Sequence, residues 1–251
     1  MSIFAETWRY LTDGASWSGP DGFVARLLEQ LLVTGTALAV AMIVGLPLAL
    51  WLGHLGRGGF VAINISNIGR AVPTFALLAL LVAADWPGSG DFGPYGRAGL
   101  ATLIALVLFA LPPLITNAYV GVREVPAELL EAADGMGMSS WQRFRRVELP
   151  LAVPVVASGV RLALVQLWAT ATIAALVAGP GVGRIITEGF ARNDYGQGLA
   201  GAVVVAVVAL VLELLAALLQ RAVDPVRRAS PDRDSRLSAS GSTVAEAPSR
   251  G

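Results

Sequence analysis

The chain has 251 residues, of which 55% are hydrophobic and 14% charged, and its mean hydropathy is +0.66. Soluble domains carry about 25% charged residues and disordered chains are poor in apolar ones, so this composition excludes both classes. Its 18 basic and 18 acidic residues cancel, so the charge gives no indication of nucleic-acid binding. Without cysteine and with a single histidine, the chain has no thiolate or His-rich metal site. Of the classes considered, the composition fits an integral membrane protein.

Apolar runs of about 20 residues, the length that crosses a bilayer, recur along the chain. They predict five transmembrane helices, at residues 28–52, 60–84, 98–121, 150–177 and 199–219. The fold class is therefore all-α integral membrane. The membrane domain is expected at residues 25–222, after an external segment at 1–24 whose acidic residues argue against a signal peptide. Residues 223–251, rich in Ser, Arg, Asp and Pro, are expected to form a disordered cytoplasmic tail.

Arginine placement predicts the orientation, because basic residues of short loops prefer the cytoplasmic side. Five spans put the two termini on opposite sides of the membrane. One side then holds ten arginines, in the loop at 123–148 and the tail above all, and the other side holds five. We therefore expect a multi-pass protein of the cell membrane, with its N-terminus outside and its C-terminus in the cytoplasm.

Several predicted spans contain proline, which removes a helical hydrogen bond and kinks the helix. Pro47 lies in the first span, Pro73 inside the second, and Pro112 and Pro113 late in the third. The freed backbone groups need neighbouring helices or water as partners. Kinks of this kind suit a pathway that opens and closes, and they occur equally in the ordinary packing of a bundle.

The loop at residues 123–148 is the most informative segment, because it holds nine charged residues between two apolar spans. Pro126 suits the start of a helix, which we expect at residues 127–134. An apolar face would run along this helix, formed by Leu129, Leu130 and Ala133.

Glycines at 135 and 137 are expected to end that first helix, since glycine readily takes the left-handed capping conformation. Ser139 or Ser140 would then cap a second short helix, and Pro150 would open the next span. Two interpretations remain open for this unit. It lies in the lipid interface as an amphipathic helix, or it docks a soluble partner.

The same loop carries a longer pattern with two fixed spacings. Glu131-Ala132-Ala133 is followed after three residues by Gly137 and after nine more by Val147-Glu148-Leu149-Pro150. This pattern resembles the EAA signature of ABC importer permeases, with Val147 in place of the more usual isoleucine. The signature of that family lies in a cytoplasmic loop, as it does here.

The likeness covers about residues 25–220 and extends to the osmoprotectant branch, which transports glycine betaine, carnitine, choline or proline. The segments that resemble this branch are residues 132–138, Ser158-Gly159-Val160-Arg161, residues 70–76, Asn193-Asp194-Tyr195 and residues 199–202. The segment 178–183 departs from the branch, because it contains Pro180 within the glycine-rich run.

The resemblance implies the transmembrane domain of a type I ABC importer. Its partners would be an ABC ATPase subunit, a second permease (the same or a related chain), an extracytoplasmic solute-binding protein and the lipid bilayer. The chain contains no lysine and so no phosphate-binding loop of the Gly-Lys-Ser/Thr type, which assigns ATP to the partner and leaves this chain without a cofactor. The residues implied in ATPase coupling are Leu129, Leu130, Glu131, Ala132, Ala133, Gly137, Leu149 and Pro150.

Polar residues within the spans are candidates for the pathway or its gate, because an ionisable group in a membrane is functional by default. The polar candidates are Arg70, Asn117, Arg161 and Gln166. Pro73 is a further candidate, for gating, because it would kink its span. Both arginines could instead reach the inner interface or pair with a helix C-terminus. Glu213 in the last span is expected at the interface.

Other functions are weaker alternatives. A permease for amino acids or methionine would share the coupling loop, since the loop does not encode the cargo. A membrane-embedded enzyme would need paired Asp residues, a metal motif or a nucleophile with its base, and no span contains Asp while His54 is expected in a loop. A scaffold would leave the coupling loop unexplained. We therefore expect no catalytic residue.

Overall fold

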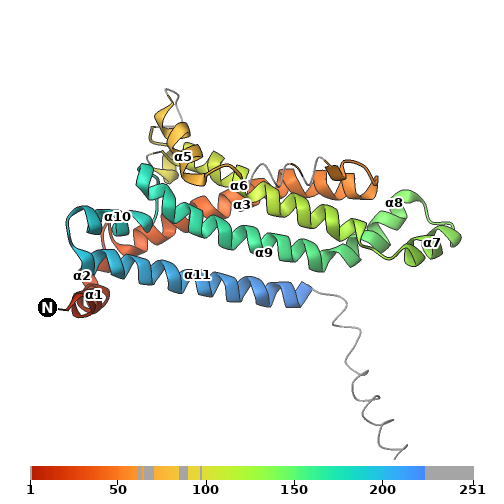
Figure 1. Cartoon of the computed structure of the whole chain (residues 1–251). Helices are drawn as coiled ribbons and strands as arrows, with labels where there is room; N and C mark the ends of the chain where they lie inside the picture. Colours follow the sequence, from red (N-terminus) through yellow and green to blue (C-terminus); the bar gives the residue numbers. More distant parts are fainter. Residues whose placement is uncertain (1, 61–63, 65–70, 85–89, 97, 224–251) are drawn as a thin grey trace, which may run out of the picture.

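The computed structural model describes residues 2–60, 64, 71–84, 90–96 and 98–223 (Figure 1). Within these residues every element is a helix. Four helices are long and apolar enough to cross a membrane: α3 (Phe23–His54), α6 (Gly99–Arg123), the helix at Ser140–Val177 that contains α9 (Leu149–Ala174), and α11 (Tyr195–Val223). They confirm four of the five predicted spans, with small differences at their ends.

The second predicted span, at 60–84, falls partly outside the described residues, and Arg70 with it. The described part contains α5 (Thr74–Ala83), which begins directly after Pro73. The prediction that Pro73 lies inside a helix is therefore wrong. Val72 and Pro73 are not helical, since a proline disfavours the helical conformation of the residue before it. A short 3-10 turn, η2 (Gly93–Tyr95), precedes α6.

The other predicted prolines do lie inside helices. Pro47 is within α3, and Pro112 and Pro113 are within α6. Pro154, inside α9, is a further one that the sequence reading did not single out. Neighbouring helices pack against all of these segments, which is the condition under which a membrane helix tolerates proline.

The core lies where α3, α6 and α9 run side by side, with α11 along α9 (Figure 1). Small side chains allow these helices to approach closely, which is how membrane helices associate. At Gly159 a Cβ atom would lie 2.6 Å from the Cβ of Asn117 on α6. The main core cluster is formed by Val33, Ala37, Ala41, Leu106, Ala110, Leu114, Ala163, Leu167 and Ala171.

Three short helices at one end of the bundle were not predicted from the sequence. They are α1 (Ile3–Thr12), α2 (Gly14–Trp17) and α10 (Gly183–Ala191), and α1 and α10 lie against α11. A fully buried Gln30 fixes the turn between α10 and η4 (Ala175–Val177) to α3. Its amide donates to Thr172 Oγ1 at 2.8 Å, and its carbonyl accepts from Val182 N at 2.9 Å.

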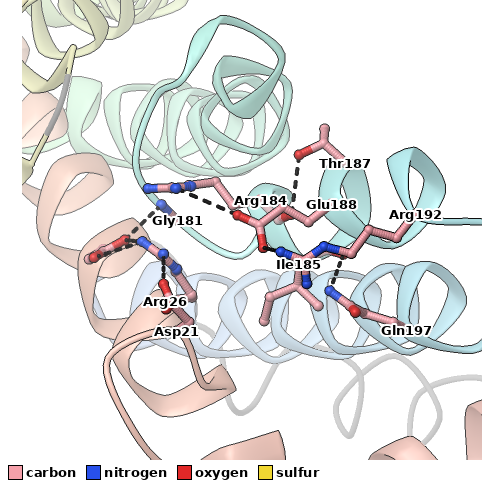
Figure 2. Close-up of polar contacts among 10 residues, drawn as sticks. Asp21, Arg26, Gly181, Arg184, Ile185, Thr187, Glu188, Arg192 and Gln197 are labelled. Atoms are coloured by element: carbon pink, nitrogen blue, oxygen red, sulfur yellow. Dashed lines mark hydrogen bonds and ion pairs between the residues drawn. The ribbon is translucent and has the colours of Figure 1, made fainter. Parts of the chain in front are cut away.

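Charged side chains reinforce this end of the bundle (Figure 2). Arg26 pairs with Asp21 and with Glu29, and Glu29 in turn accepts a hydrogen bond of 3.1 Å from the backbone N–H of Gly181. On α10, Arg184 and Glu188 pair at 3.5 Å. The segment expected to be an external loop therefore contains a helix that polar contacts hold in place.

Candidate functional site

The loop after α6 forms two helical segments at the opposite end of the bundle from α1 and α10 (Figure 1). The first is α7 (Ala127–Gly135), one residue longer than expected, with Pro126 at its N-cap. Glu128 lies in its first turn, where a negative charge is favourable beside the exposed N–H groups.

The faces of α7 differ from the expected ones. Ala133 is 1% exposed and packs inside this chain, so it cannot belong to an apolar stripe offered to a partner, and Leu130 is half-buried. The exposed apolar positions are instead Leu129, Ala132 and Met136, at a spacing of i, i+3 and i+7. Met136 is 70% exposed and was missed by the sequence reading, because it follows the last residue of the expected helix. Glu131 is exposed as well.

The end of α7 is a Schellman motif. Gly137 has φ +76°, its N–H donates to the carbonyl of Asp134 at 2.9 Å, and the N–H of Met138 donates to the carbonyl of Ala133 at 3.2 Å. Gly135, also expected to end the helix, is its last helical residue and does not adopt a positive φ. The left-handed conformation therefore explains the glycine at 137 alone.

The second segment begins at α8 (Ser140–Arg143), and Ser139 is its N-cap. Ser139 Oγ accepts from the N–H of Gln142, and the Gln142 side chain accepts from the N–H of Ser139 at 2.9 Å. This reciprocal capping box settles the choice between the two serines that the sequence left open.

The segment then runs without a break through the π-helical turn η3 (Phe144–Glu148) into α9. Pro150 lies in the first turn of α9, as expected, but α9 continues the helix that begins at Ser140. In the wider turn the N–H of Leu149 donates to the carbonyl of Phe144, and this register accommodates a proline in the next position. Leu149 packs against the buried residues Val122, Phe144 and Ala152.

A buried carboxylate, Glu148, joins three parts of this site. It is 3% exposed, and its Oε2 lies 2.6 Å from Nδ1 of His54 at the end of α3. Its Oε1 accepts a hydrogen bond of 3.0 Å from Nε of Arg143, which also pairs with Asp134 on α7 at 2.7 Å. The second ring nitrogen of His54 lies 2.7 Å from Ser140 Oγ. We call these five residues the Glu148 network.

The sequence reading missed this network, since it placed His54 in a loop and gave Glu148 no partner. His54 is the last residue of α3, and its side chain is 4% exposed. The one available signal was chemical: the only histidine of the chain directly follows an apolar span, and a carboxylate sits within the signature.

Among the described residues, no polar contact joins the candidate pathway residues Asn117, Arg161 and Gln166 to one another. Asn117 donates to the Pro113 carbonyl of its own helix at 2.8 Å, and Gln166 is half-buried on α9. Arg161 pairs with Glu213 of α11 and also donates a hydrogen bond to Gln220 in the last turn of the same helix. Glu213 has its partner within this chain, and its expected position at the interface stays a prediction. No group of three or more potential metal ligands occurs among the residues described.

Comparisons with known proteins agree with this architecture. Residues 41–229 match the family described as binding-protein-dependent transport system inner membrane component. The chain is 36% identical to the osmoprotectant import permease protein OsmY of Salmonella typhimurium, over 78% of this chain and 80% of that protein. It is 29% identical to the glycine betaine/carnitine/choline transport system permease protein OpuCB of Bacillus subtilis, over 78% of this chain and 86% of that one.

The fold has a close counterpart among solved structures. A chain of the inward-facing methionine ABC transporter MetNI superposes with a TM-score of 0.66 and 22% identity, over 80% of this chain and 95% of that chain. At this level of identity the likeness supports the fold and says nothing about cargo.

Proposed function

The chain belongs to the family of binding-protein-dependent transport system inner membrane components, and from this membership we propose that it is the permease subunit of an ATP-driven importer of small osmoprotectants. It is a transport component and not an enzyme. The proposed cargo is glycine betaine, choline, carnitine or proline, since its relatives are named as permeases for osmoprotectants, glycine betaine, carnitine and choline. Methionine and other amino acids are the alternative cargo.

The observation that carries the proposal is the combination of α7 and the Glu148 network. Leu129, Ala132 and Met136 offer an apolar stripe to a soluble partner, and Glu131 beside them can pair with a basic residue. We propose that the partner is the ATPase subunit, which seats α7 in a groove. Gly137 sets the angle at which α7 leaves the bundle.

A movement of α7 could be transmitted to the membrane helices in two ways. Asp134, Arg143 and Glu148 connect α7 to α8 and η3 through charge-assisted hydrogen bonds, which are stronger than neutral ones. Because the helix at Ser140–Val177 is continuous, a tilt of its α8 end would also tilt α9. The contact of Glu148 with His54 would transmit the same movement to α3. ATP-driven closure of the ATPase pair would then rock both helices and alternate the access of the pathway.

The remaining partners follow from the same proposal. A second permease, identical or related, would complete the pathway, and an extracytoplasmic solute-binding protein would deliver cargo to the end formed by α1 and α10. Under this proposal α7 lies in the cytoplasm and the N-terminus outside, and the arginine distribution supports this orientation.

Uptake in cells tests the proposal. Deleting the gene should reduce uptake of labelled glycine betaine, choline, carnitine or proline at high osmolarity, and the intact gene should restore it. Labelled methionine is the comparison, and its uptake should not change. Normal uptake of all four osmolytes in a strain without sister transporters would overturn the cargo, and loss of methionine uptake would favour the alternative.

A further inference from the structure

A cluster of polar side chains lies between α9 and α11 and extends to Gln220 in the last turn of α11. Arg161 is twelve residues after Leu149 and thirteen before Ala174, which at about 1.5 Å per residue puts it about 18–20 Å from each end of α9. Its ion-pair partner Glu213 lies ten residues before the end of α11. Arg161 therefore lies near the middle of α9, and Glu213 lies about 15 Å before the end of α11.

The two helices contribute two polar side chains each. Arg161 Nε donates to Glu213 Oε1 at 2.8 Å, and its NH1 donates to Gln220 Oε1 at 3.3 Å. Gln220 Nε2 donates in turn to Ser158 Oγ at 2.7 Å. Arg161 and Glu213 are each 37% exposed, so about a third of the charged pair faces the space outside this chain.

That space is a cavity of about 350 Å³ that is largely open on one side, with apolar walls from Leu162 and Val165 beside the four polar residues. A cavity of this size is in the range of small-molecule sites, which combine apolar walls with a few placed polar groups. Charges exposed to hydrocarbon at this depth are costly, so the open side faces water or protein. The cavity therefore suits a polar solute better than a lipid tail.

We propose that this cavity is a transient subsite for a zwitterionic solute on its way through the membrane. The solute carboxylate replaces Glu213 on the guanidinium of Arg161, and its cationic end lies against the Glu213 carboxylate with its methyl groups on Leu162 and Val165. Because the ion pair closes again when the solute leaves, the site is neutral in both states. This inference rests on the proposed function, since it needs a zwitterionic cargo.

The test compares three variants of the reconstituted importer: Arg161→Gln, Glu213→Gln and the double variant. A purely structural pair would be broken by either single change and rescued by the double change, because no charge is then left unpaired. If the pair forms a solute site, the double change should not restore transport. We expect the double variant to assemble with its partners and hydrolyse ATP, but to import glycine betaine at least about tenfold more slowly, as expected for a lost charge-assisted contact.

Arg161→Gln should in addition impair glycine betaine more than choline, which has no carboxylate, whereas Glu213→Gln should impair both. The wild-type importer, assayed in parallel with both solutes, provides the reference for these comparisons. Full glycine betaine uptake by the double variant, or its failure to associate with the second permease, would overturn the subsite. A wild-type importer that moves none of the osmolytes would refute the proposed function instead.

Discussion

Nδ1 of His54 lies 2.6 Å from Oε2 of Glu148, although the two residues are 94 positions apart in the chain. The contact joins the last residue of α3 to the turn that leads into α9, at the end of the bundle that carries α7. Arg143 approaches the other carboxylate oxygen, so the buried charge has a partner on each side. The end of α3 is therefore linked directly to the segment at Ser140–Glu148.

The first prediction concerns this contact. His54→Ala should lower the free energy of unfolding by about 1–3 kcal/mol, because a buried carboxylate oxygen loses its partner. Transport should fall several-fold while the ATPase still binds α7. Thermal unfolding in detergent and uptake into vesicles measure the two effects. His54→Gln keeps a donor near Glu148 and should retain more of both. Equal behaviour of the two variants would contradict this role of the ring nitrogen.

The second prediction concerns the end of α7. Gly137→Val should strain a backbone that has φ +76°, by roughly 1–2 kcal/mol or more, and so tilt α7 out of its groove on the ATPase. Co-purification of the ATPase and cargo-stimulated ATP hydrolysis should both fall several-fold, while membrane insertion continues.

Gly135→Ala is the matched control for that change. Neither glycine has an atom within 4 Å of an added Cβ, but only Gly137 has a positive φ, so Gly135→Ala should keep coupling. Glu131→Ala should have a mild effect, since an exposed ion pair contributes about 0–1 kcal/mol. If Gly137→Val binds the ATPase and transports normally, α7 is an interfacial helix and not the coupling element.

The third prediction concerns the contact of α9 with α6. Gly159→Ala adds a Cβ that would lie 2.6 Å from the Cβ of Asn117, so the helices must separate at a cost of about 1–3 kcal/mol. Thermal unfolding in detergent should shift to lower temperature. Gly35→Ala, in α3 with no atom within 4 Å of the new Cβ, should be neutral or stabilising. The same shift in both variants would argue against close packing at 159.

The fourth prediction concerns orientation. A fluorescent reporter that matures in the cytoplasm should be active when fused after Met138 or after Val223, and alkaline phosphatase should be active when fused after Gly90 or after Asn193. The arginine asymmetry is the physical reason. The opposite pattern would overturn the N-outside orientation.

The sequence by itself determined the features that are local in the chain. Apolar runs with at most one internal charge predicted α3, α6, α9 and α11, since a bilayer needs about 20 mostly apolar residues whatever their neighbours are. The extent of α7 and the special position of Gly137 also followed from nearby proline and glycine, because helix ends depend on a few adjacent residues.

Only the tertiary structure decided which residues meet across the fold. The pairs His54–Glu148 and Arg161–Glu213 join helices that no local periodicity relates to each other. The same packing turned Ala133 inward and left Met136 exposed, because the orientation of a short helix depends on what it packs against. Hydrophobic periodicity predicts which face of one helix is buried. Which side chains of other helices that face contacts depends on how the whole bundle packs.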